Sequence, residues 1–290
     1  MKRVLLTTDF SAVSEKAVRY MLNLMGNHAC EFTFLHAYYS FPSDSSAEAS
    51  FSYFETIYSH SKASMRQFIA SAEQADQRQI HTFKRLLLPA SPAGALRFLS
   101  YQNDFDLIVA GTRGQRDDIF FGNMATDIVR NVPGNALIVP ERMNMAPLRN
   151  VVMAVDAQST CSVGELTALK AILKANNATL TLLTTIKNKA SDKDLSMLPT
   201  YDYHYFFKGI EVIDYPIYAR NLEDGISKYL NFHEADMLVT VTRQRSFFEG
   251  LFNRSLTSKL AQNPTVPFMS IYSKATAAVV TNEASIFNQR

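Results

Sequence analysis

Cysteine is scarce in this sequence, and long apolar runs are missing. Cys30 and Cys161 are the two cysteines among 290 residues, which excludes a disulfide framework and favours the reducing cytoplasm. Neither has a second cysteine or a histidine at ligand spacing, so no metal site is predicted. No apolar run approaches the roughly 20 residues of a membrane span. Met1-Lys2-Arg3 leads directly into Val4-Leu5-Leu6, an apolar stretch that is too short for a signal peptide. We therefore expect a cytoplasmic protein with no membrane partner.

The sequence also lacks a cluster of charged residues of one sign. The net charge is +2, and the 29 lysines and arginines are scattered. A nucleic-acid partner is not expected, because it requires a concentrated basic patch. Apolar residues make up 47% and charged residues 19% of the chain, which favours a globular core over disorder. The length is sufficient for two domains of ordinary size.

Recognisable catalytic groupings are the third absence. The six histidines are dispersed, and neither a GxSxG elbow nor a P-loop is present. His36 lies inside an apolar stretch, where a histidine is more often a satisfied core residue than a general base. We therefore predict no catalytic residue.

A glycine-rich segment has a similar second copy later in the chain, and that copy lacks the glycines. Residues 105–140 and 235–272 are similar. Asp106, Val109, Thr112 and Arg113 recur as Asp236, Val239, Thr242 and Arg243. In place of Gly111, Gly114 and Gly122, the second copy has Val241, Gln244 and Arg254. This pattern indicates a duplication in which one copy alone keeps the glycines.

The first copy has the order expected of a phosphate-binding turn. A buried strand, Leu107–Ala110, is followed by a loop from Gly111 to Gly122 and a helix from Asn123. Glycines let backbone N–H groups approach a phosphate, and the helix N-terminus adds partial positive charge. The alternative is that these glycines only permit a sharp turn between strand and helix.

Strand and helix signals alternate in both halves. Strands are expected at 4–8, 31–39, 80–88, 107–110, 136–139, 150–155, 179–184, 210–215, 237–241 and 268–272. Helices are expected after Ser11, over 51–75, after Ser91, and over 165–175, 221–232 and 256–261, with 187–208 irregular and rich in aromatic residues. Such alternation predicts parallel sheets covered by helices on both faces. The domains are predicted as 1–145 and 146–275, followed by a polar tail, 276–290.

These segments together resemble a tandem universal stress protein. The resemblance is carried by KRVLLTTDFS, SEKAVRYMLNL, FTFLHAYY, DLIVAGTRG and the ending ATDIVR…ALIVP. It implies two α/β domains with open parallel sheets, Rossmann-like and similar to the adenine-nucleotide alpha-hydrolases. In the family the final strands pair across a two-fold axis. Strands 136–139 and 268–271 would therefore pair within one chain as an internal pseudo-dimer, with a homodimer as the alternative.

The resemblance also implies a site for ATP or another adenine nucleotide, accompanied by Mg²⁺. Asp9 would meet the ribose, Ala37 would border the adenine, and Thr8, next to Asp9, is also a predicted binding residue. Gly111 and Gly114 would line the path of the ribose and phosphates. Facing the phosphates would be Gly122, Asn123 and Met124.

The first half departs from the family motif in three ways. Seven residues, Gln115–Phe121, replace the usual nine between two glycines, and Asn123 replaces a hydroxyl residue. Asp117 and Asp118 add negative charge, which opposes phosphate binding. We therefore expect weak binding in this half.

The second half is interpreted as a degenerate, structural copy, because side chains occupy its three glycine positions. The chain as a whole is expected to be a nucleotide-sensing or protein-interaction module without catalysis, with a protein partner that the sequence does not identify. Two alternatives remain open. One is a slow ATP hydrolase or nucleotidyl-transfer enzyme, and the other is a structural binder without nucleotide.

Overall fold

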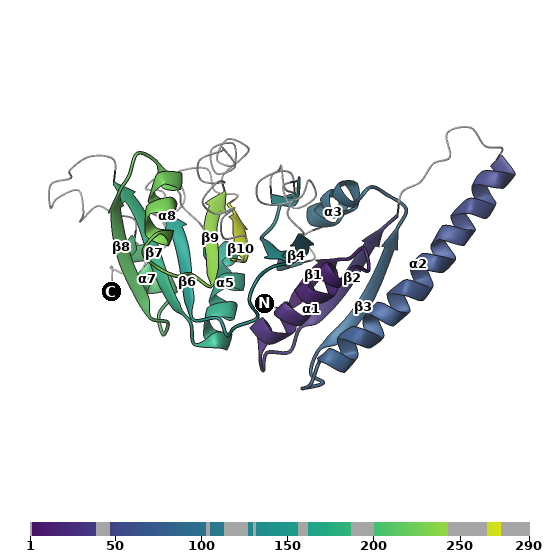
Figure 1. Ribbon diagram of the computed structural model, residues 1–290, viewed down its shortest axis with the longest axis horizontal. Helices are drawn as coiled ribbons and strands as arrows, with labels where there is room; N and C mark the ends of the chain where they lie inside the picture. The colour runs from purple at the N-terminus through teal and green to yellow at the C-terminus, as the bar shows by residue number, and fades with distance from the viewer. Residues whose placement is uncertain are drawn as a thin grey trace, which may run out of the picture. The chain divides into compact units, whose positions relative to one another are not determined.

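The computed structural model describes residues 2–38, 47–102, 105–112, 127–129, 132–155, 162–186, 200–242 and 266–273. The chain divides into two compact units, Met1–Met145 and Ala146–Arg290. Each unit is an open α/β sheet (Figure 1).

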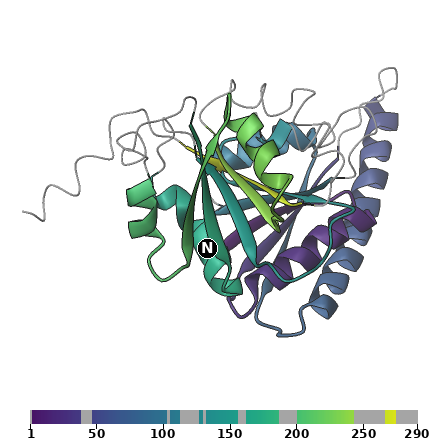
Figure 2. The same ribbon diagram turned by 60° about the vertical axis from the view of Figure 1, so that its left-hand side comes forward.

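The described part of the first unit contains five parallel strands in the order β3-β2-β1-β4-β5. They are β1 (Arg3–Thr7), β2 (Glu31–Ala37), β3 (Thr82–Leu88), β4 (Leu107–Thr112) and β5 (Ala136–Pro140). The helices are α1 (Ala12–Met25), α2 (Ala47–Ala75) and α3 (Pro92–Tyr101), and residues 127–129 are also helical. Right-handed crossovers place α1 and α2 on one face and α3 on the other. Figure 2 shows α1 beside α2, which it contacts.

Helix α1 begins and ends where its sequence signals predict. The Ser11 hydroxyl accepts a hydrogen bond from the Ser14 N–H at the N-cap, and Gly26 ends the helix with a positive φ of 53°. Met21 and Met25 are fully buried on its apolar stripe. The amphipathic pattern therefore fixes both the length of α1 and the face that it turns to the sheet.

The second unit repeats this arrangement. Its parallel strands have the order β10-β9-β6-β7-β8. They are β6 (Asn150–Val155), β7 (Thr179–Ile186), β8 (Val212–Tyr218), β9 (Met237–Thr242) and β10 (Phe268–Tyr272), with helices α5 (Val163–Asn176), α7 (Thr200–Phe206) and α8 (Leu222–Leu230). The prediction of α/β units with open parallel sheets is confirmed.

The aspartates of the repeat have the same structural role in both units. Lys2 and Arg3 donate their backbone N–H groups to Asp106 Oδ2, at 2.7 and 3.0 Å. In the second unit, Arg149 and Asn150 donate to Asp236 Oδ2, both at 2.8 Å. Asp106 directly precedes β4 and thus links it to the start of β1. Asp236 directly precedes β9 and links it in the same way to the start of β6.

The structure corrects three expected segments. Gly111 was expected in a loop, but it belongs to β4 and pairs with Val139 of β5. The segment 187–208 was expected to be irregular, but Thr200–Phe206 is helix α7. The strand expected at 210–215 is β8, Val212–Tyr218. The helix expected at 256–261 and the tail expected at 276–290 lie outside the described residues.

A buried histidine lies at the amino edge of the first sheet. His81 Nδ1 accepts a hydrogen bond from the Cys30 N–H at 3.2 Å, and Nε2 lies 4.0 Å from Asp76 Oδ1. His81 and Asp76 are both buried. Burial lowers the pKa of His81, opposed by the Asp76 carboxylate and reinforced by the charge of Arg78. The folded unit therefore favours the neutral imidazole.

Acidification is expected to destabilise the protein through His81. The unfolded chain binds the proton more readily, so the stabilisation is complete above the usual imidazole range of about 6.5 and declines as the pH falls below it. Urea unfolding at about pH 7.5 and pH 5.5 measures this change. His81→Gln should reduce the pH dependence, whereas His28→Gln, at an exposed position, should leave it unchanged. Equal profiles for wild type and His81→Gln would contradict the prediction.

Candidate functional site

The carboxyl edge of the first sheet contains a topological switch point. From β1 the chain proceeds to β2 and β3 on one side, and it then crosses to β4 and β5 on the other. Ligands of open α/β sheets bind in the crevice where this reversal occurs. Thr8 and Asp9 follow β1, and Gly111 and Thr112 end β4. Ala37 ends β2, the other neighbour of β1.

The structure thus brings four of the eight predicted site residues to one edge. Thr8, Asp9, Ala37 and Gly111 come from the ends of three adjacent strands. The other four lie outside the described residues, together with Asp117 and Asp118. They are Gly114, Gly122, Asn123 and Met124.

Thr8 shapes the turn that begins the site. Its N–H donates to the Leu35 carbonyl at 2.9 Å, which continues the pairing of β1 with β2. Its hydroxyl accepts the Phe10 N–H at 2.9 Å and lies 2.9 Å from the Ser14 hydroxyl. The side chain is buried. Thr8 therefore holds the β1–α1 turn in place, with its hydroxyl engaged inside the protein.

Asp9 is an exposed carboxylate at this edge. Its Oδ1 accepts the Ser11 N–H at 3.0 Å, which orients the side chain beside the N-terminus of α1. A carboxylate accepts several hydrogen bonds at once, so it can also receive those of a sugar diol. Asp9 is thus the described residue best suited to contact a polar ligand.

A side chain at position 111 would collide with helix α1. A Cβ at this position would lie 2.8 Å from the Val13 carbonyl oxygen and 2.9 Å from Val13 Cγ1. The close approach is made by the backbone of α1 to the end of β4. The absence of a side chain at Gly111 therefore lets α1 pack against the sheet, and its predicted place along the path of the ribose and phosphates stays a prediction.

Two further residues at this edge, Phe10 and His36, were not predicted as site residues. Phe10 has a positive φ of 64°, and its ring centroid lies 4.3 Å from that of His36. His36 Nδ1 lies 2.8 Å from the Thr8 carbonyl oxygen. His36 is hydrogen-bonded as expected, yet it is half-buried at the edge of the crevice. Its place next to Ala37, at the end of a strand, was the signal available in the sequence.

The second unit has different residues at the equivalent edge. Val241 takes the place of Gly111 and is buried in β9. The hydroxyls of Thr184, Thr185 and Thr240 are buried and have no hydrogen-bond partner. The residues that follow β6 and β9, 156–161 and 243–265, lie outside the described residues. A packed valine thus replaces the backbone contact that Gly111 makes.

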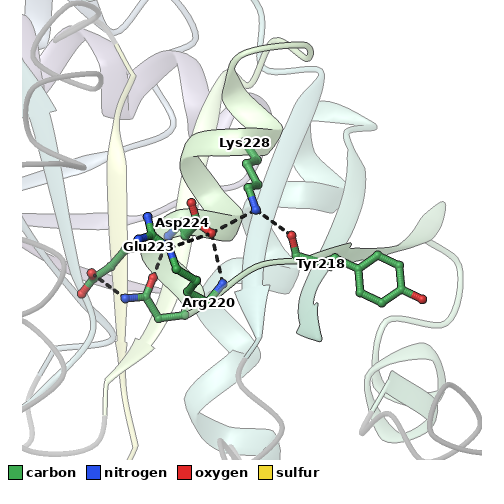
Figure 3. A network of polar contacts seen from close by, with 6 residues as sticks. Tyr218, Arg220, Glu223, Asp224 and Lys228 are labelled. Carbon is green, nitrogen blue, oxygen red and sulfur yellow. Dashed lines mark hydrogen bonds and ion pairs between the residues drawn. The ribbon is translucent and has the colours of Figure 1, made fainter. Parts of the chain in front are cut away.

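Charged residues at the β8–α8 turn of the second unit balance one another (Figure 3). The Asp224 carboxylate accepts the Arg220 N–H at 3.0 Å and pairs with Lys228 Nζ at 3.0 Å. Lys228 also donates to the Tyr218 carbonyl at 2.8 Å. The hydrogen bond from the Arg220 N–H is the largest cause of the lowered pKa of Asp224; desolvation opposes it, and the contacts with Lys228 and the charge of Arg220 lower the pKa further. This network closes a turn and leaves its charges internally compensated.

The described residues contain no group of three or more His, Cys, Asp or Glu side chains placed to hold a metal ion. Among the helices that the structure describes, none has the length and apolarity needed to cross a bilayer.

Comparison with known proteins supplies the family of the first unit. Residues 1–140 match the Universal stress protein family. The first unit therefore contains a universal stress protein domain, and the match does not extend to the second. No curated protein sequence matches the chain.

Solved structures share the fold over most of the chain. A universal stress protein from Archaeoglobus fulgidus DSM 4304 has a TM-score of 0.69 at 15% identity, covering 93% of this chain and 98% of its own. A putative universal stress protein from Pseudomonas aeruginosa UCBPP-PA14 has a TM-score of 0.57 at 11% identity, covering 94% of both. The cytoplasmic domain of a prokaryotic cation chloride cotransporter also has 0.57, at 9% identity, covering 96% of this chain and 98% of its own. At these identities the likeness concerns the fold, which hosts different functions.

Proposed function

We propose that the universal stress protein domain binds an adenine nucleotide at the carboxyl edge of its sheet and that the chain is a non-catalytic nucleotide-sensing module. The observation that carries the proposal is the exposed Asp9 carboxylate, oriented by the Ser11 N–H at the switch point of the sheet. The family match over residues 1–140 supports it.

The described residues suit the parts of a nucleoside. Asp9 would accept hydrogen bonds from the ribose hydroxyls, and the base would lie beside the small side chain of Ala37 at the end of β2. Gly114, Gly122, Asn123 and Met124 would hold the phosphates, with Mg²⁺ neutralising part of their charge. Asp117 and Asp118 would weaken this binding by repulsion, more strongly at low salt.

Binding is proposed for the first unit alone. In the second half, Gln244 and Arg254 replace Gly114 and Gly122, so side chains would project where the backbone would approach the phosphates. The second unit would then have a structural role. Pairing of strands 136–139 with 268–271, a protein partner and a cytoplasmic location remain parts of the proposal.

Loss of the Asp9 charge is expected to weaken ATP binding about 10-fold, because hydrogen bonds to a charged group contribute roughly 1.5–3 kcal/mol. Asp9→Asn keeps an oxygen that can accept the Ser11 N–H, so the turn should be preserved. Calorimetric titration of the full chain with ATP and Mg²⁺ measures the change. Asp156→Asn, at the equivalent sequence position of the second half, is the matched control and should bind like wild type.

Three outcomes would count against the proposal. If the wild-type protein binds no ATP, the proposed site does not exist. If Asp9→Asn and Asp156→Asn lower the ATP affinity equally, binding is not confined to the first unit. Release of phosphate from ATP by the purified protein, abolished in Asp9→Asn, would replace the sensing role with slow hydrolysis. Mass spectrometry of the denatured protein adds an independent test, because a bound nucleotide would be released and identified.

A further inference from the structure

The His36 ring is fixed in orientation at the edge of the proposed nucleotide site. It lies at the second-last residue of β2, next to Ala37. The Phe10 ring lies against it, with centroids 4.3 Å apart, and Tyr38 is stacked at 6.4 Å and 19°. Phe10 also contacts the buried Phe68 of α2, at 6.0 Å. The imidazole therefore has one packed position, although it is only half-buried.

The hydrogen bond to Thr8 sets which ring nitrogen carries the proton. His36 Nδ1 lies 2.8 Å from the Thr8 carbonyl oxygen, and a carbonyl oxygen only accepts, so Nδ1 must donate. In the neutral ring, a proton on Nδ1 leaves Nε2 as an acceptor. Within the described residues, no hydrogen bond to Nε2 is present. The site edge thus offers one oriented acceptor nitrogen.

We propose that His36 selects adenine over 6-oxopurines, by accepting a hydrogen bond from the 6-amino group through Nε2. The inference rests on the proposed nucleotide binding, which places the base beside Ala37. Adenine has an N–H donor at position 6, whereas guanine and hypoxanthine have a carbonyl oxygen there. Two acceptors facing each other repel and leave a polar group unpaired. His36 would therefore determine specificity, and Asp9 affinity.

The second unit has no equivalent of this ring. Glu31 N–H donates to the Lys2 carbonyl, and Thr179 N–H donates to the Arg149 carbonyl, so Glu31 and Thr179 are equivalent positions. Five residues further along each strand are His36 and Thr184. Thr184 is almost fully buried, and its hydroxyl has no partner. Thr184→Val is therefore a control substitution at the position of the second unit that is equivalent to His36.

The test compares ATP with inosine triphosphate, which has a carbonyl oxygen at position 6. Calorimetric titrations of the full chain, at one pH for both nucleotides, measure the two affinities. We expect wild type to bind ATP about 3- to 10-fold more tightly than inosine triphosphate, the range of one net hydrogen bond. His36→Phe keeps an aromatic ring and should reduce this ratio to about one. His36→Gln, whose amide can both donate and accept, should restore part of it, and Thr184→Val should not change it.

The outcomes separate this inference from the proposed function. If wild type binds neither nucleotide, the proposed function fails and the inference with it. If both bind but the ratio is the same in wild type and His36→Phe, the inference alone is overturned. Equal loss of both nucleotides in His36→Phe would make His36 a structural residue and also overturn it. A nitrogen NMR spectrum of the nucleotide-free protein should show the proton on Nδ1, and a proton on Nε2 alone would overturn the argument before any titration.

Discussion

Gly111→Ala is expected to lower the free energy of unfolding by about 2–3 kcal/mol, the upper part of the range for overpacking. The added Cβ would lie 2.8 Å from the Val13 carbonyl oxygen. Because that atom belongs to the backbone of α1, relief requires a shift of the helix, and rotation of a side chain does not suffice. Urea unfolding of the full chain measures the loss.

Gly164→Ala is the matched control for this prediction. Gly164 is exposed in the first turn of α5, and nothing lies within 4 Å of its added Cβ. Alanine there should be neutral or stabilise by up to about 1 kcal/mol, because glycine is the poorer helix former. A Gly111→Ala variant as stable as wild type would contradict the packing role of Gly111.

Asp106→Ala is expected to destabilise the first unit by about 2 kcal/mol, because two backbone N–H groups lose a charged acceptor. Burial alone would raise the pKa of Asp106, but the Lys2 and Arg3 N–H groups and the nearby positive charges lower it on balance. The folded-state pKa is below the unfolded value, so this stabilisation is present above about pH 4 and is lost as the pH falls further.

The repeat provides the comparison for Asp106. Asp236 accepts the equivalent pair of N–H groups from Arg149 and Asn150, so Asp236→Ala should cost a similar amount. Thermal and urea unfolding of both variants tests this equivalence. A large loss from one substitution and none from the other would contradict a shared structural role.

Much of the sheet was predictable from local sequence. The central strands are buried on both faces, so they appear as short apolar runs with polar ends, and β6 and β10 have the predicted bounds. The edge strand β8 was predicted two residues early at its start and three early at its end. Asp214 and Pro216 interrupt its apolar pattern, because only one side of an edge strand is paired.

The candidate site was predictable only in outline. The family motif identified the strand ends at Asp9, Ala37 and Gly111, and strand topology brings those ends to one edge. The function of each side chain there depends on contacts between residues far apart in the sequence. Gly111 meets Val13, and His36 meets Thr8 and Phe10.

The sequence by itself determined the α/β class, the repeated order of strands and helices, and the asymmetry between a glycine-bearing half and a half without glycines. These follow from apolar periodicity, capping residues and backbone freedom, which act over a few neighbouring residues. The tertiary structure decided that Gly111 contacts the backbone of α1, that Thr8 holds a turn, and that the His36 ring lies against Phe10 and within hydrogen-bond distance of the Thr8 carbonyl oxygen. Those assignments depend on distances between separate elements, which the local pattern of a chain does not contain.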